Sequence, residues 1–284
     1  ITSFTDFTVR ASSISESVSG DLFVPSKVQF SGKELIVTEV GDDFANSNLA
    51  ISSLTIDDGV ISIGERAFKN CANLATVNIA QTVTKIGTEC FYGCTALETF
   101  CNDGIITIGP KSFAECKNLK EVSIEKLDLL QLGTFLNCIQ LTDCNFPNIT
   151  SIGKEAFKNC QSLKKYNITE KVNSIGGFAF QGCTSLFSII IPNSVKELES
   201  DIFKGCTALT SISIGTGIKY LPWVFDGCTS LSDIRIEDSS STLIFGYTGK
   251  RSVPHSYDDE PINEREYNYR YSTAMFSGVN LKSI

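Results

Sequence analysis

The sequence predicts a repeat solenoid of the α/β type, in which short strands and single helical or 3₁₀ turns alternate along a coil. Three features of the sequence lead to this fold class. Cysteines recur at intervals of 22 or 23 residues, a Phe stands three residues before each, and a Leu stands three residues after it. The recurring cysteines are Cys71, Cys94, Cys116, Cys138, Cys160, Cys183, Cys206 and Cys228. Their mean spacing, (228 − 71)/7 or about 22.4 residues, lies in the range of leucine-rich repeats.

Residues 1–36 come before the repeats and are expected to form a small antiparallel β cap. The stretch alternates β-branched and aromatic residues with polar ones, and "SGD" and "SGK" have the composition of turns between short strands. Such a cap would shield the open end of the solenoid.

Residues 37–238 hold about nine repeats with the consensus V-x-x-I-G-x-x-A-F-x-x-C-x-x-L-x-x-I-x-I. The ending L-x-x-I-x-I alternates like a half-buried strand, and the opening V-x-x-I indicates a second short strand on the outer side of the coil. In the middle, Ala67, Phe68, Cys71 and Leu74 have helical spacing and are expected to face the core. Gly64 and its equivalents suit either a positive φ or a close approach of two backbones.

The copies at the array's start and middle are irregular. "VGDDFANSNLAISSLTI" retains Phe44 and, by its position, Leu49, but lacks the cysteine. The repeat "LDLLQLGTFLNCIQL" lacks the Ile-Gly pair.

The pattern is interrupted near the end of the chain. Residues 239–273 are expected to form an insertion loop or hairpin, and residues 274–284 a last partial repeat. Insertions in solenoids gather on one face, often the binding face. The insertion is rich in tyrosine, the residue type most used at protein contacts. A spacer without a ligand is an equally good interpretation.

The segments "IGERAFKNCANLATVNI", "IGTECFYGCTALETF" and "IGGFAFQGCTSLFSIIIPNSV" resemble the BspA-like (treponemal-type) leucine-rich repeats. The resemblance implies a right-handed leucine-rich repeat coil with a parallel β-sheet on its concave face. It also implies a secreted or cell-surface bacterial protein, with related copies in some parasitic protists. Members of the family are associated with adhesion, and no enzymatic residues come with the resemblance.

Charge and hydropathy argue against some partners and locations. The formal net charge of −8 argues against nucleic acid as a partner. No run of eighteen apolar residues occurs, so no membrane-spanning segment is expected. The chain starts at Ile1 without a leader, which we interpret as a mature form whose signal peptide has been removed.

The residues that could carry chemistry are not arranged as a site. The repeated cysteines are best explained as buried packing residues, while the side on which Cys101 lies is left open. Zinc sites need closely spaced pairs plus further ligands, and the single histidine, His255, falls in the insertion without a catalytic motif. We therefore expect no enzyme, no cofactor and no metal site.

The expected function is protein–protein binding or adhesion to host or other cells. The partner would be a host extracellular matrix or cell-surface protein, and the chain would be a monomer. A passive surface spacer and a glycan-binding module are the alternatives. Candidate contacts are the outward strand residues and the insertion tyrosines. They are Glu121, Asp143, Lys165, Asn167, Asp233, Arg235, Tyr247, Tyr257, Tyr267, Tyr269 and Tyr271.

Overall fold

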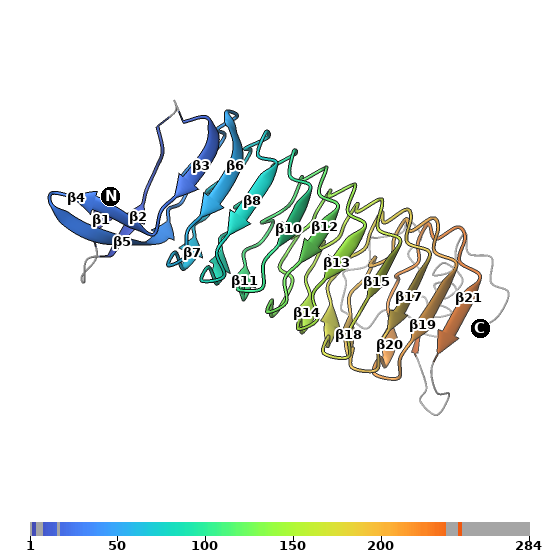
Figure 1. The fold of residues 1–284 in the computed structure, drawn as a ribbon. Helices are drawn as coiled ribbons and strands as arrows, with labels where there is room; N and C mark the ends of the chain where they lie inside the picture. Colours follow the sequence, from blue (N-terminus) through green and yellow to red (C-terminus); the bar gives the residue numbers. More distant parts are fainter. Residues whose placement is uncertain (1, 4–7, 16–17, 237–243, 246–284) are drawn as a thin grey trace, which may run out of the picture.

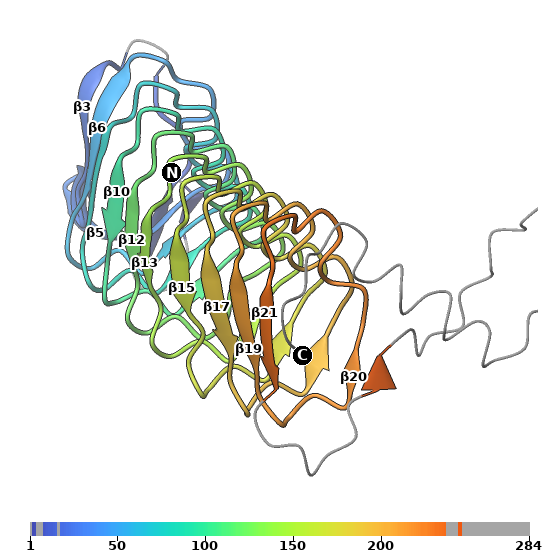
Figure 2. The same ribbon diagram turned by 90° about the vertical axis from the view of Figure 1, so that its right-hand side faces the viewer.

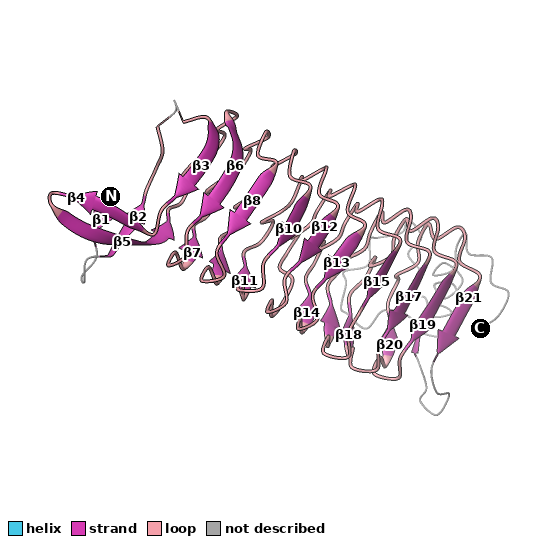
Figure 3. Ribbon diagram, viewed as in Figure 1, coloured by secondary structure: helices cyan, strands magenta, loops and turns pink. Residues whose placement is uncertain are grey.

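The structure is a computed structural model that describes residues 2–3, 8–15, 18–236 and 244–245. Its stacked coils form a parallel-strand β-solenoid, as the resemblance predicted (Figure 1). Each regular coil contributes one strand to each of two faces, which the turned view separates (Figure 2). Between the faces the chain runs through turns and loops (Figure 3).

One face carries the longer strands, and we call it the strand face. Its strands pair in parallel in three sheets, β3-β6-β8, β10-β12-β13 and β15-β17-β19-β21. They are β3 (Gly20–Val24), β6 (Ile51–Ile56), β8 (Thr76–Ile79), β10 (Thr99–Cys101), β12 (Glu121–Ser123), β13 (Asp143–Asn145), β15 (Lys165–Asn167), β17 (Ser188–Ile191), β19 (Ser211–Ile214) and β21 (Asp233–Ile236).

The opposite side, the short-strand face, is built mainly from two-residue strands that also pair in parallel, as the V-x-x-I opening predicted. These are β2 (Thr8–Ala11), β5 (Lys33–Val40), β7 (Ser62–Ile63), β9 (Lys85–Ile86), β11 (Thr107–Ile108), β14 (Ser151–Ile152), β16 (Ser174–Ile175), β18 (Glu197–Leu198), β20 (Tyr220–Leu221) and β22 (Ile244–Phe245). Two further strands, β1 (Thr2–Ser3) and β4 (Lys27–Phe30), lie at the N-terminal end.

The N-terminal segment is only partly the antiparallel cap that the sequence suggested. β1–β2 and β4–β5 pair antiparallel, but β2–β5 and β3–β6 pair in parallel. β2 and β3 therefore extend the two faces of the solenoid by one coil. In the next coil Ile51 is fully buried at the position of Leu74, whereas Leu49 is 58% exposed, so assigning Leu49 to the repeat was wrong.

The middle of each repeat contains no helix among the described residues, contrary to the expected helical or 3₁₀ turn. Arg66 and Asn70 have positive φ angles of 52° and 58°, which a right-handed helix excludes. The backbone N–H groups of Arg66, Phe68 and Asn70 instead donate to carbonyls of the next coil at 2.6–2.9 Å. The turn segment is therefore a third row of coil-to-coil hydrogen bonds.

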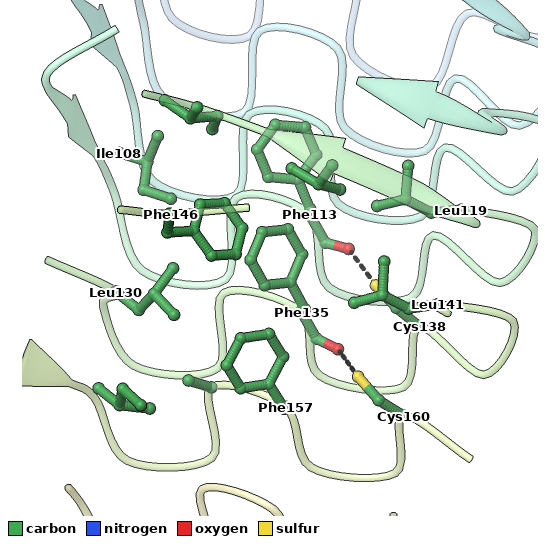
Figure 4. Packing of buried hydrophobic residues seen from close by; sticks show 14 of the residues in the cluster. Ile108, Phe113, Leu119, Leu130, Phe135, Cys138, Leu141, Phe146, Phe157 and Cys160 are labelled. Atoms are coloured by element: carbon green, nitrogen blue, oxygen red, sulfur yellow. Dashed lines mark hydrogen bonds between the residues drawn. The ribbon is translucent and has the colours of Figure 1, made fainter. Parts of the chain in front are cut away.

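The core is a column of stacked aromatic rings. Successive repeat phenylalanines from Phe68 to Phe225 are fully buried, with ring centroids 5.3–6.2 Å apart. Figure 4 shows Phe113, Phe135 and Phe157 in this column, with the repeat leucines beside them. Each coil thus buries its apolar side against its neighbours, as a solenoid requires.

The repeated glycines allow two coils to approach closely. A Cβ at Gly87 would lie 2.5 Å from the carbonyl carbon of Gly64, and one at Gly109 would lie 2.3 Å from the Thr88 nitrogen. Positive φ is not the reason, because neither glycine adopts it. The close approach of backbones, one of the two explanations left open, is the one that the structure supports.

At the C-terminal end, β22 lies inside the range expected as an insertion, yet it pairs in parallel with β20 like a solenoid strand. The rest of residues 239–273, and the whole of 274–284, lie outside the described residues.

Candidate functional site

The thiols were the first candidates for chemistry. Each repeat cysteine is buried, and its Sγ donates a hydrogen bond to a carbonyl of the preceding coil. Cys138 donates to the Phe113 oxygen at 3.1 Å and Cys160 to the Phe135 oxygen at 3.2 Å (Figure 4). Burial raises the pKa of Cys116 to about 12. Because the thiolate is the nucleophile and the metal ligand, these cysteines serve packing and not catalysis.

Two cysteines lie outside this ladder, on strand-face strands. Cys144, the cross-strand partner of the buried Val122, packs partly buried against the core. Cys101, whose side the sequence left open, is exposed on the strand face. Partial burial, followed by the charge of Glu121, raises its pKa, so the neutral thiol is favoured here too.

Strand register arranges the outward side chains of the strand face in two straight rows. One row runs through Thr99, Glu121 and Asp143, because these residues are direct cross-strand partners. The row continues on the last sheet from Lys165 through Ser188 and Ser211 to Asp233. The parallel second row ends with Asn167, Ile190, Ser213 and Arg235.

The predicted strand residues all point outward on this face, although they do not gather in one place. Glu121, Asp143, Lys165 and Asn167 are exposed on three successive strands, β12, β13 and β15. No strand pairing joins β13 to β15 among the described residues. Asp233 and Arg235 lie three ladder steps beyond Lys165, about 14 Å at the usual strand spacing.

The charges of these residues are compensated unequally. Arg235 contacts Asp233 at 2.9 Å, so this pair is satisfied within the chain. On neighbouring positions, Lys120 similarly pairs with Glu98 at 2.9 Å. Within the described part of the chain, the carboxylates of Glu121 and Asp143 have no hydrogen-bond or ion-pair partner, although the two residues are direct cross-strand neighbours. Like charges opposite each other destabilise a sheet, so a cation from outside would be favoured here.

Two apolar residues on this face were not singled out from the sequence. Ile190 is 62% exposed beside Asn167, and Phe23 is 56% exposed beside Thr55. Phe23 was missed because β3 was assigned to a cap. The alternation in "DLFV", with Leu22 and Val24 inward, was the signal that could have placed it on the array.

The remaining candidates fall beyond the described residues. They are Tyr247, Tyr257, Tyr267, Tyr269 and Tyr271, together with His255. In the described ranges, no group of three or more His, Cys, Asp or Glu side chains could hold a metal ion. A helix of sufficient length and apolarity to cross a membrane is likewise not found in that part of the chain.

Comparison with protein families gives one extended match. The model described as "BspA type Leucine rich repeat region (6 copies)" matches residues 38–164 and 150–248. The two ranges together cover 248 − 38 + 1 = 211 of the 284 residues. No curated protein matches the sequence.

Several solved structures are similar to the chain. A leucine-rich repeat protein from Bacteroides ovatus is 23% identical, with a TM-score of 0.48 over 87% of this chain and 76% of that one. A leucine rich cell surface protein from Faecalibacterium prausnitzii is 21% identical, with a TM-score of 0.37 over 84% and 92%. The pneumococcal vaccine antigen PcpA is 15% identical, with a TM-score of 0.37 over 83% and 82%.

Proposed function

Because the chain belongs to the BspA-type leucine-rich repeat family, we propose that it is a non-enzymatic secreted or cell-surface protein that binds a partner protein. The strand face is the proposed contact, centred on Glu121, Asp143 and Lys165. A host extracellular or cell-surface protein is the proposed partner. The tyrosine-rich segment of the predicted insertion, from Tyr247 to Tyr271, is proposed as a second part of the contact.

The single observation behind this proposal is the pair of uncompensated carboxylates on a flat, exposed face. Glu121 and Asp143 stand side by side without a cation of their own, amid small polar residues such as Ser123 and Asn145. A flat polar surface suits a protein contact better than a small-molecule pocket. The carboxylates would select a partner with a lysine or arginine, and such association would weaken with added salt.

The test begins with capture of purified host extracellular proteins on the intact chain, followed by an affinity measurement for any partner recovered. Replacing Glu121, Asp143 and Lys165 together by Ala should weaken binding at least about tenfold, or ~1.4 kcal/mol. The matched control replaces Asp128, Lys196 and Glu197 by Ala. It removes the same charges from the opposite side of the solenoid.

A second variant replaces residues 249–272 with a Gly/Ser linker and leaves β22 in place. Loss of binding in this variant alone would assign the contact to the tyrosine-rich segment. If the strand-face variant, the linker variant and the control all bind like the parent, the strand face is not the contact. Failure to recover any partner would favour the passive surface spacer.

A further inference from the structure

The short-strand face carries an open groove of about 520 Å³ over β5, β7, β9 and β11. Gly64, Gly87 and Gly109 line it at the same position of three successive coils. These glycines cannot carry a side chain, because a Cβ at any of them would lie within 2.6 Å of the neighbouring coil. The volume of the groove is that of a small-molecule site.

Side chains line the groove at both ends. At one end Arg10 contacts Glu39 at 3.2 Å and Asp42 at 2.8 Å. At the other end Gln131 takes the place that a glycine has in the neighbouring repeats. The groove spans the coils of β5 to β11, about 14 Å at the usual strand spacing, which suits a short ligand and not a long polymer.

The charges along the groove leave one ammonium group without a partner. Arg10 is shared between Glu39 and Asp42, and Glu65 contacts Arg66 at 3.4 Å. The Lys85 ammonium group forms no hydrogen bond or ion pair with the described residues. It stands in the middle of the wall, because Ser62 and Thr107 are its cross-strand partners on either side. A central cation thus lies between two hydroxyl groups, and the side chain of Thr88 lines the groove as well.

We propose that this groove binds a short oligosaccharide that carries one carboxylate. Lys85 would bind the carboxylate as a point charge, and the hydroxyls of Ser62, Thr88 and Thr107 would exchange hydrogen bonds with those of the sugar. A strongly charged polyanion is disfavoured, because only one cation is uncompensated and the chain carries a net charge of −8.

An acidic peptide fits the groove less well, because an extended peptide is recognised mainly through backbone hydrogen bonds. The N–H groups of Gly64, Gly87 and Gly109 already donate to carbonyls of the preceding coil at 2.8–2.9 Å. Side-chain hydroxyls and the Lys85 ammonium are left for a ligand, and these match a sugar. The groove lies on the face opposite the proposed protein contact, so each proposal can be tested independently of the other.

The experiment titrates the full chain with a disaccharide that contains one glucuronic acid, with its neutral glucose counterpart and with a short acidic peptide. Binding is followed by calorimetry. We expect the acidic sugar to bind at least about tenfold more tightly than the neutral one. Lys85→Gln should abolish this difference and leave the fold, checked by circular dichroism, unchanged.

A steric pair of variants locates the site. Thr107→Trp should block the groove and abolish binding. Ser174→Trp places the same ring in the same row on β16, outside the groove, and should bind like the parent. The proposal is overturned if neither sugar binds at millimolar concentration, if Lys85→Gln or Thr107→Trp leaves binding unchanged, or if the peptide binds more tightly than the acidic sugar.

Discussion

Substitution of Gly109 by Ala is the sharpest test of how the coils are stacked. The new Cβ would meet the Thr88 nitrogen at 2.3 Å and the Gly87 carbonyl carbon at 2.6 Å. Both contacts are to backbone, which cannot swing aside as a side chain would. The two coils would have to separate, although the Gly109 N–H group bonds to the Ile86 oxygen at 2.9 Å. Overpacking usually costs about 1–3 kcal/mol, and we expect about 3 kcal/mol or more here.

Gly205→Ala provides the matched control, because its cost comes from a positive φ angle and not from a close contact between backbones. Gly205 has a φ of +72°, and the nearest atom to a new Cβ is 4.0 Å away. The left-handed conformation costs an alanine about 1–2 kcal/mol, partly offset by the reduced entropy of the unfolded chain. Other coils tolerate Asn70 and Glu115 at this position with φ angles of 58° and 62°. A cost of about 1 kcal/mol is therefore expected.

Equilibrium unfolding in denaturant, followed by circular dichroism, compares the two variants. Because repeat arrays can unfold in stages, the comparison uses the transition that contains the altered coil. If Gly205→Ala destabilises the protein as much as Gly109→Ala, close backbone approach is not what fixes glycine at position 109.

The other predictions concern the core. Phe157→Ala removes a ring stacked between Phe135 and Phe180 and should cost ~3–5 kcal/mol in denaturant unfolding; a change within ~0.5 kcal/mol would mean that the side chain is exposed. A thiol reagent should modify the exposed Cys101 of the native protein first, and the eight ladder cysteines only after denaturation, while a reducing agent leaves Tm unchanged. Rapid reaction of a ladder cysteine in the native protein would contradict the packing assignment. Burial raises the folded-state pKa of Cys116 to about 12, so the stability that its neutral thiol contributes should be complete below about pH 8.5 and decline as the pH rises towards 12. The free energy of unfolding, measured between pH 8 and 11, checks this. The absence of any decline would count against buried thiols.

The inward positions were predictable from the sequence because they repeat. Phe68, Cys71 and Leu74 and their equivalents are fully buried, as their spacing indicated. The helical turn was wrong for a physical reason: spacing reports which side chains point inward, and not where the backbone hydrogen bonds go. A run of turns whose N–H groups bond to the next coil presents the same residues to the core as a helical turn does.

The outward residues were predictable as exposed, but their chemical state was not. Whether a charge is compensated depends on a residue one coil away, about 22 positions along the chain. Asp233 is bound to Arg235 on its own strand, whereas the cross-strand neighbour of Asp143 is Glu121, which adds repulsion. The sequence did contain one signal for the groove, since the repeat with Gln131 lacks the Ile-Gly pair. That Gln131 lies at one end of a groove could be recognised only from the residues that surround it in the structure.

The two faces differ because each coil crosses them with different chain geometry. On the strand face, each strand has three or more residues, and every second side chain points outward. These outward side chains together make a flat surface. On the short-strand face, a glycine follows many of the two-residue strands and lets successive coils approach closely. The groove lies where three successive repeats have this glycine. A flat surface is suited to a large partner and a hollow one to a small ligand. Because coils interact only with their neighbours, Lys85 on one face and Asp143 on the other can vary without disturbing the shared core.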